Sequence, residues 1–323
     1  MIKLDKLDKK LLMELDLDSR QPYSQLAKKL NTSQQVISYR TKKLVDSGVI
    51  TSFVTTFSSI SLGLNIIKIY IQYSGMTKKK EEEIYEFLSN HKSVNWISKV
   101  LGNYDLFVAI MVKDISLLGE FKAEFFQKFG KYIGYYTTSI IQRAYTFPRP
   151  YLSDKNQRAI KPALIHKELN LNLDRKERLL IKEISNNSRI SVIELSKKLD
   201  LNVKTILKKI SALNKSGVIQ GYRINIDRGK IGQKYYKIFI KLKSYDPEDY
   251  KLVKTFCLGR KYLVHLIECV GEYEIELEME ISESERIEET IQEIRNNYSY
   301  VIARIESCEI TNEMKLTWLP NGF

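Results

Sequence analysis

The chain has 323 residues, 43% of them hydrophobic, with a net charge of +13 and a pI near 9.3. This length leaves room for two to four domains, and the composition is typical of a globular protein. No apolar run approaches the roughly 20 residues of a membrane span. The charged start does not resemble a signal peptide, so we expect a cytoplasmic protein with a polyanionic partner and no membrane association.

The sequence repeats itself with an offset of 169 residues. Ser-Gly-Val-Ile occurs at 47–50 and again at 216–219, and Lys-Ile-Tyr-Ile at 68–71 matches Lys-Ile-Phe-Ile at 237–240. No gap is needed along this path. A period this long indicates a duplicated domain pair rather than a solenoid. We call residues 1–146 copy one and residues 171–323 copy two.

The first part of each copy has the pattern of three helices followed by a strand. In copy one, leucines at 7, 11, 12 and 15 have helical spacing, and helices over 23–30 and 34–47 follow. Ser33 is placed to cap the third helix, and Gly48 to end it before a β-branched run. Copy two repeats the pattern with Asn202 and Gly217. Three helices, a short turn and a strand predict a winged helix-turn-helix in each copy.

The second part of each copy predicts a ferredoxin-like βαββαβ unit. The strands expected in copy one are 66–73, 94–101, 104–112 and 135–145, with helices at 78–90 and 117–129. Those expected in copy two are near 235–243, 262–270, 272–281 and 300–311, with helices near 248–257 and 284–296.

The fold class is therefore α+β, with two winged helix-turn-helix domains and two ferredoxin-like βαββαβ domains in tandem. The expected boundaries are 1–60 and 61–146 for copy one, a proline-rich linker over 147–170, and 171–229 and 230–323 for copy two. Because each domain occurs twice, we expect an internal pseudo-dimer, which could associate further into a homodimer or higher oligomer.

Charge is unevenly distributed along the chain. Residues 1–50 carry 10 basic and 6 acidic side chains, and residues 170–216 carry 11 and 5, whereas residues 266–323 carry 14 acids against 4 bases. Positive charge thus gathers in both helix-turn-helix segments, which favours double-stranded DNA as the partner.

This arrangement resembles the Lrp/AsnC (feast/famine, leucine-responsive) transcription regulators. The resemblance rests on the LDKLDKKLL start, the Ser-Gly-Val-Ile after the third helix, and the Gly102-Asn103-Tyr104-Asp105 turn, and it covers nearly the whole chain twice. Copy two departs from the pattern with LDRKE at its start and Glu274 in place of the Asp. The resemblance implies RAM-type ferredoxin-like domains, a small amino-acid effector, and effector binding at Gly102, Asn103, Tyr104 and Asp105.

The outward faces of the two third helices are the candidate DNA contacts. With Ile37, Thr41 and Leu44 turned inward, the third helix of copy one exposes amide, hydroxyl and basic groups, which pair with base edges or phosphates. Arg40, Lys43 and Lys209 either touch phosphates or brace their helices. The predicted DNA-binding residues are Gln34, Gln35, Ser38, Tyr39, Arg40, Lys42, Lys43, Lys204, Thr205, Lys208 and Lys209, and Val203 and Ser211 share the outward face.

The stretch GEYEIELEMEI (271–281) places five Glu on one side of a strand. Such a row could face a metal or a cationic ligand, or form a cross-strand ladder with Lys237, Lys241 and Lys243 on the neighbouring strand. The ladder is the simpler interpretation. The matching strand of copy one, LFVAIMV, is apolar on both faces, so the two sheets have diverged.

Catalytic motifs are absent from the sequence, and we expect no enzyme activity, cofactor or metal site. The three cysteines (Cys257, Cys269 and Cys308) form no CxxC pair and are expected to be reduced, buried thiols. The rival interpretation is a sirohaem-decarboxylase-like enzyme of the same fold, for which a His- and aromatic-rich sheet face is expected. His91, His166 and His265 are instead scattered along the chain.

Overall fold

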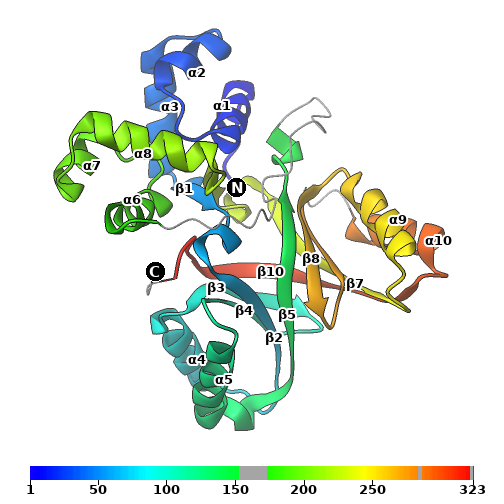
Figure 1. Cartoon of the computed structure of the whole chain (residues 1–323). Coiled ribbons are helices and arrows are strands. Elements are labelled where there is room, and N and C mark those ends of the chain that lie inside the picture. The colour runs from blue at the N-terminus through cyan, green and yellow to red at the C-terminus, as the bar shows by residue number, and fades with distance from the viewer. Residues whose placement is uncertain (153–172, 283–285, 321–322) are drawn as a thin grey trace. The chain divides into compact units, whose positions relative to one another are not determined.

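The computed structural model describes residues 1–152, 173–282, 286–320 and 323. They form two compact units, each built from both copies: residues 1–62 with 146–233, and 63–145 with 234–323 (Figure 1). We call these the helical unit and the barrel unit. The four-domain division stays a prediction, and most of the predicted linker lies outside the described residues.

The helical unit contains the two predicted helix-turn-helix segments. Copy one contributes α1 (Lys6–Leu17), α2 (Tyr23–Lys29), α3 (Gln34–Asp46), β1 (Ile50–Phe57) and the short η1 (Ile60–Leu62). The linker-proximal η3 spans Pro150–Leu152. Copy two contributes α6 (Arg175–Ser185), α7 (Val192–Leu199), α8 (Val203–Lys215), β6 (Ile219–Ile226) and η4 (Gly229–Ile231). Each copy thus folds as three helices followed by one strand.

The predicted ends of the third helices are confirmed. The Ser33 hydroxyl accepts a hydrogen bond from the backbone N–H of Val36 at 3.2 Å, and the Asn202 side chain accepts one from Thr205 at 2.8 Å. Gly48 and Gly217 have φ angles of +71° and +79°, the left-handed conformation in which glycine ends a helix without strain.

The two helix-turn-helices are joined to each other within the helical unit. Strands β1 and β6 pair antiparallel and form a two-stranded sheet of their own. Nearby, the buried hydroxyl groups of Ser19 and Ser188 are 2.6 Å apart. The Arg20 guanidinium donates to backbone carbonyls of copy two, and Arg189 donates to those of copy one. The pairing expected from the duplication is therefore present in this unit.

The barrel unit contains the two ferredoxin-like segments in the predicted order. Copy one contributes β2 (Asn65–Tyr73), α4 (Lys78–Asn90), β3 (Val94–Gly102), β4 (Leu106–Val112), α5 (Ser116–Phe129), η2 (Gly130–Tyr132) and β5 (Ile133–Thr146). Copy two contributes β7 (Gln233–Leu242), α9 (Pro247–Leu258), β8 (Leu263–Gly271), β9 (Ile275–Ser282), α10 (Ile287–Tyr298) and β10 (Ile302–Leu316).

The two four-stranded sheets close into one barrel. Its strand order is β10-β3-β4-β2-β5-β8-β9-β7, so the copies meet at two seams, β3 with β10 and β5 with β8 (Figure 1). The copy-one helices pack on the outer face of their sheet, where Ile84, Phe121 and Phe125 are buried against strand residues such as Ile69 and Val108. Inside the closed barrel, side chains of both copies form a hydrophobic core that is separate from the core beneath the copy-one helices.

A glycine stands at the same position of each seam, at the end of β3 and of β8. A Cβ atom on Gly102 would lie 2.9 Å from the carbonyl oxygen of Ser307. One on Gly271 would overlap the carbonyl oxygen of Thr138. Both residues also have positive φ, at +142° and +153°, which side chains rarely adopt. Glycine is therefore required at both seams by close approach of the partner strand.

Candidate nucleic-acid interface

The outward face of α3 carries the side chains that the sequence predicts. Ile37, Thr41 and Leu44 are buried, as expected from their spacing. The Tyr39 side chain is the most prominent, with 69% of its surface exposed. The exposed residues of the predicted set are Gln34, Gln35, Ser38, Tyr39, Lys42 and Lys43.

The outward face of α8 has a different chemistry. Ile206, Ile210 and Leu213 are buried, and the exposed predicted residues are Val203, Lys204, Lys208 and Ser211, with Thr205 half-buried. The sequence analysis missed one member of this face, Leu207, whose side chain is 52% exposed. The 169-residue offset could have found it, because its equivalent is the outward-facing Ser38.

Arg40 and Lys209 brace their helices, one of the two roles left open for them. The Arg40 guanidinium lies 2.5 Å from Asp5 and 2.8 Å from Asp8 at the start of α1. The Lys209 ammonium is 2.6 Å from Asp174 and 3.3 Å from Glu177 at the start of α6. Hydrogen bonds to these carboxylates raise the pKa of both basic groups. Their contact with DNA stays a prediction.

These acids also begin the first helix of each copy. Asp5 and Asp8 form a reciprocal capping box at the start of α1, and Asp174 and Glu177 form one at the start of α6. The LDKLD start of copy one (residues 4–8) and the LDRKE start of copy two (residues 173–177) therefore have the same structural role. Each fixes the first helix and anchors the third helix through one basic residue, which holds the outward face of the third helix in position.

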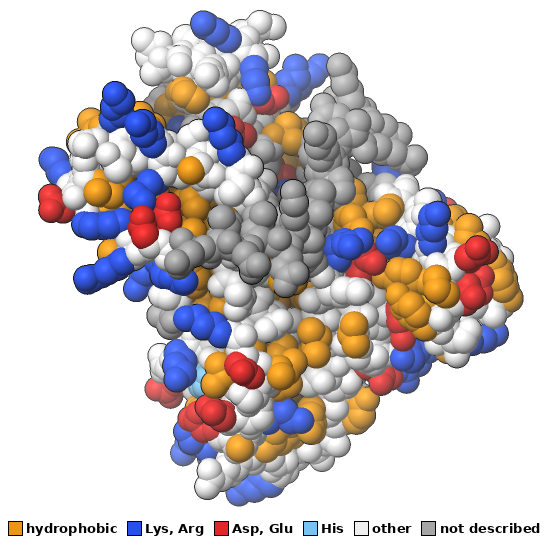
Figure 2. All heavy atoms as spheres, in the orientation of Figure 1, with side chains coloured by type: hydrophobic (Ala, Val, Ile, Leu, Met, Phe, Trp, Pro, Cys, Tyr) orange, Lys and Arg blue, Asp and Glu red, His pale blue; other side chains and the backbone are white. Residues whose placement is uncertain are grey.

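Basic side chains gather over α7 and α8 (Figure 2). The exposed lysines of these two helices are Lys197, Lys198, Lys204, Lys208 and Lys215. Lys198 is ion-paired with Glu183 at 2.9 Å. The positive charge of copy two therefore lies on the helix-turn-helix surface, where a polyanion would be attracted to it.

The predicted effector turn is occupied by structural contacts. The Tyr104 side chain is buried in the barrel interior, where its hydroxyl group lies 2.6 Å from that of Tyr273, its equivalent in copy two. The carbonyl oxygen of Asn103 accepts a hydrogen bond from Gln72. The Asp105 carboxylate accepts one from the backbone N–H of Tyr73 at 2.7 Å.

Copy two has Glu274 where copy one has Asp105, and Glu274 makes the equivalent hydrogen bond to the first strand of its sheet. The Glu274 carboxylate accepts a hydrogen bond from the backbone N–H of Leu242 at 2.8 Å, and Leu242 is the equivalent of Tyr73. The longer side chain also reaches Lys241 at 2.9 Å. Both turns are thus tied to the first strand of their sheet in the same way.

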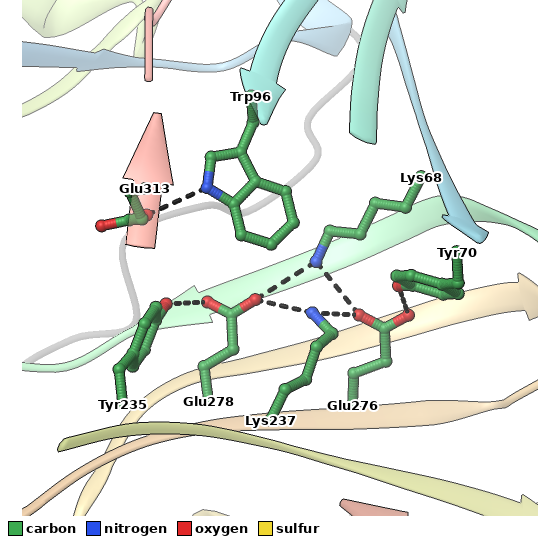
Figure 3. A network of polar contacts seen from close by, with 8 residues as sticks. All are labelled: Lys68, Tyr70, Trp96, Tyr235, Lys237, Glu276, Glu278 and Glu313. Atoms are coloured by element: carbon green, nitrogen blue, oxygen red, sulfur yellow. Dashed lines mark hydrogen bonds and ion pairs between the residues drawn. The ribbon is translucent and has the colours of Figure 1, made fainter. Parts of the chain in front are cut away.

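The Glu row of β9 faces lysines inside the barrel (Figure 3). The Lys237 ammonium, fully buried, lies 2.7 Å from both Glu276 and Glu278. The Lys68 ammonium, from copy one, lies 3.0 Å from Glu276 and 3.3 Å from Glu278. The predicted ladder is confirmed for Lys237 and Lys241. It is wrong for Lys243, which donates instead to the carbonyl oxygen of Ser299.

Hydroxyl groups complete this network. Tyr70 donates to Glu276, and Tyr235 donates to Glu278 at 2.6 Å. Burial by itself would raise the pKa of Glu276, but the charges of Lys237 and Lys68 outweigh burial and hold that pKa at about 2. The same lysines hold the pKa of Glu278 well below its usual value against the same effect of burial. Both carboxylates are therefore ionised and paired at neutral pH.

The described ranges contain no group of three or more His, Cys, Asp or Glu side chains arranged to hold a metal ion. Cys257, Cys269 and Cys308 are buried free thiols, as predicted. His91, at the end of α4, packs against Phe87 of α4 and Phe121 of α5. His166 lies outside the described residues. None of the helices within these ranges is both long and apolar enough to cross a membrane.

Paired three-helix modules with exposed basic third helices define the class of the protein, a winged helix-turn-helix DNA-binding protein. A family model of that description matches twice, at residues 4–51 and 173–220. An HTH-type transcriptional regulator of Pyrococcus horikoshii is 39% identical over 108 residues, which cover 33% of this chain and 71% of that protein. The HTH-type transcriptional regulator Ptr1 of Methanocaldococcus jannaschii is 29% identical over 38% of this chain and 80% of its own.

The chain therefore belongs to the HTH-type transcriptional regulators, with the helix-turn-helix model matched once in each copy. Its fold is also that of the sirohaem decarboxylase NirDL, whose crystal structure covers 98% of this chain and 94% of its own with a TM-score of 0.63. The sequence identity of that pair is 16%, so the similarity shows the fold alone.

Proposed function

We propose that this transcriptional regulator binds double-stranded DNA through α3 and α8 and reads a site with two unlike halves. The observation that carries the proposal is the difference between two equally exposed helix faces. Gln34 and Gln35 present amides at the start of α3, where Val203 and Lys204 stand on α8. Glutamine pairs with adenine, and lysine with guanine or phosphate, so the two faces prefer different base edges.

The internal pairing supports an asymmetric site. Because β1 pairs with β6, one chain presents one α3 and one α8. A homodimer of identical subunits would present the same helix twice and would read a palindrome. If two chains pair with each other through a true two-fold axis, the site becomes a longer palindrome with unlike inner and outer half-sites.

Salt dependence tests whether α8 touches DNA. Lys204→Ala/Lys208→Ala is expected to weaken binding and to flatten its log–log salt dependence by roughly 0.9 for each phosphate that is no longer neutralised. Lys209 is left unchanged because it braces the helix. The matched control is Lys78→Ala/Lys79→Ala, which removes two exposed lysines at the start of α4 in the barrel unit. An unchanged slope in the α8 variant would exclude contact between these two lysines and DNA.

An amino-acid effector is the second part of the proposal, and it rests on the resemblance at Gly102–Asp105. Exposed Asn103 and Asp105 flank the buried Tyr104, so a ligand at this turn would contact the outer part of the barrel seam. The test is a shift in the unfolding temperature of the purified protein with each of the amino acids in turn. Loss of a positive shift in Asp105→Asn would support the turn, whereas no shift with any amino acid would count against an effector of this class.

The alternative function is a sirohaem-decarboxylase-like activity, favoured by one observation, the whole-chain fold similarity. Two features argue against it. In the barrel interior the polar groups of Lys68, Lys237, Glu276 and Glu278 bind each other. Of the described histidines, His265 lies on β8 opposite Glu278, whereas His91 packs against Phe121 of α5. Purified protein that carries a porphyrin Soret band and fails to retard any DNA would favour the enzyme. Colourless protein that retards DNA selectively would favour the regulator and the absence of enzyme activity.

A further inference from the structure

The exposed face of α8 contains two apolar side chains one helical turn apart. Val203 and Leu207 are 38% and 52% exposed. They are separate from the core of the module, which α8 supplies with Ile206, Ile210 and Leu213. At the equivalent positions α3 carries the polar residues Gln34 and Ser38. At these two positions the apolar pair therefore occurs in copy two and not in copy one.

The surroundings of this pair fit DNA better than an apolar protein partner. Lys204 and Lys208 follow Val203 and Leu207 directly in the sequence and are both exposed, so basic side chains border the apolar pair along the helix. Positive charge beside an apolar contact is complementary to the phosphate backbone that borders the base edges in a groove. The apolar feature of the major groove is the C5-methyl group of thymine.

The position on the helix also fits. Val203 is the first residue of α8 and Leu207 the fifth, and base contacts in helix-turn-helix proteins come from the N-terminal residues of this helix. Four residues span about 6 Å along a helix axis. Successive bases rise about 3.4 Å. The pair therefore matches thymines about two base steps apart.

We propose that Val203 and Leu207 contact thymine methyl groups and so determine the base preference of the half-site under α8. The proposal rests on the proposed function, and names the ligand chemistry of one of its two half-sites. It also accounts for Val203 and Leu207 at the positions where α3 has Gln34 and Ser38, because methyl recognition needs an apolar surface rather than a hydrogen-bonding group.

Deoxyuridine provides a direct test, because it differs from thymidine by the loss of this methyl group alone. The full chain is bound to a duplex selected from random DNA, and each thymine of the α8 half-site is replaced by deoxyuridine. Burial of one methyl group corresponds to roughly fourfold in affinity, so two replacements are expected to weaken binding roughly 15-fold. The same replacement in the α3 half-site is the internal control and is expected to change affinity less than twofold.

Two variants identify the residues responsible. Val203→Gln/Leu207→Ser installs the side chains that α3 carries at these positions, and is expected to bind thymine and deoxyuridine duplexes equally. Leu207→Met keeps an apolar side chain and is expected to remain sensitive to deoxyuridine. Circular dichroism compares the folding of the variants. Equal binding of both duplexes by the unchanged protein would overturn methyl recognition while leaving DNA binding intact. Failure of the unchanged protein to select any DNA would instead reject the proposed function.

Discussion

The two copies share their supporting contacts and differ in the surfaces those contacts hold. Arg40 and Lys209 brace the third helices against paired acids, and Tyr104 and Tyr273 meet each other inside the barrel. By contrast, the face of β4 that carries Phe107 and Ala109 into the interior corresponds to Glu276 and Glu278 on β9. The comparison teaches that the contacts which hold the duplicated geometry are kept, whereas the side chains that the two sheets turn into the barrel have diverged.

The interior difference has a consequence for pairing. Lys68 and Lys237 occupy equivalent positions, but both carboxylates that neutralise them come from copy two. Two copy-one sheets facing each other would bury two ammonium groups without a partner. Two copy-two sheets would bury more carboxylates than ammonium groups, and unpaired buried charges are strongly destabilising. Pairing of unlike sheets is therefore favoured in the barrel unit, and in the helical unit copy one likewise pairs with copy two through β1 and β6.

Removal of the carboxylates is expected to have the largest effect. Glu276→Gln/Glu278→Gln keeps the side-chain shape but leaves Lys68 and Lys237 buried without counter-charges, and should lower the free energy of unfolding by roughly 3–5 kcal/mol. Both tryptophans of the chain, Trp96 and Trp318, lie in the barrel unit, so denaturation followed by tryptophan fluorescence reports on this unit.

The matched control and a rescue sharpen this comparison. Glu82→Gln/Glu86→Gln, on the exposed face of α4, should change stability by less than about 0.5 kcal/mol. Adding Lys68→Met/Lys237→Met to the interior variant removes the unpaired charges and should restore much of the loss. A loss of under about 1 kcal/mol in the interior variant would mean that the buried charges do not select the partner sheet.

The stability of the barrel unit should also depend on acid. The pKa of Glu276 is depressed in the folded state to about 2, against 4.5 as its ordinary value. Its contribution is therefore fully present above about pH 4.5 and is lost as the pH falls toward 2, in total about 3 kcal/mol. The gap in unfolding free energy between the unchanged protein and Glu276→Gln should narrow over that interval. A gap that stays constant would contradict the pairing of Glu276 with the lysines.

The seam glycines give an intermediate effect. Gly271→Ala introduces a methyl group that overlaps the carbonyl oxygen of Thr138 at a positive φ, and should cost roughly 1–3 kcal/mol. Gly119→Ala is the control, because this glycine lies within α5 and a Cβ there meets no other atom within 4 Å. It should stabilise the protein by roughly 0.5–1 kcal/mol. Equal responses of the two variants would argue against close approach of the strands at this seam.

The smallest expected effect is at the helix brace. Arg40→Ala should lower stability by about 0.5–1 kcal/mol, because the ion pair with Asp5 and Asp8 is partly exposed. Arg40→Lys copies the chemistry of Lys209 and should keep most of that stability. Neither change should alter the salt dependence of DNA binding. A slope reduced by roughly 0.9 in Arg40→Ala would show that this side chain contacts a phosphate instead.

Local signals in the sequence predicted the elements well. Helix caps at Ser33 and Asn202 and the glycines that end both third helices depend on neighbouring residues, and all four are confirmed. The barrel seams and the pairing of β1 with β6 join strands that lie far apart in the chain, so no local pattern specifies their register. The repeat contained a signal for the ion pairs between copies, because Lys68 of copy one is the equivalent of Lys237. The Lys–Glu ladder was nevertheless predicted within copy two alone.

The helix faces show the same limit. The spacing of the buried residues correctly predicted which side chains of the candidate DNA contacts on α3 are exposed. On α8 it predicted most of the exposed side chains. Leu207 was absent from the predicted outward set, although its equivalent in copy one, Ser38, was included. The choice between the two roles of Arg40 was left open because its acidic partners, Asp5 and Asp8, lie at the start of another helix.

The central claim is that the two third helices read different bases, and selection from random DNA by the purified full chain tests it most directly. The account predicts an enriched site with unlike halves, one adenine-preferring under Gln34 and Gln35 and one thymine-rich under Val203 and Leu207. If two chains bind together, the same unlike halves should recur as inner and outer parts of a longer palindrome. A single short palindrome with identical half-sites would contradict the account, because only one of the two helices would then read bases.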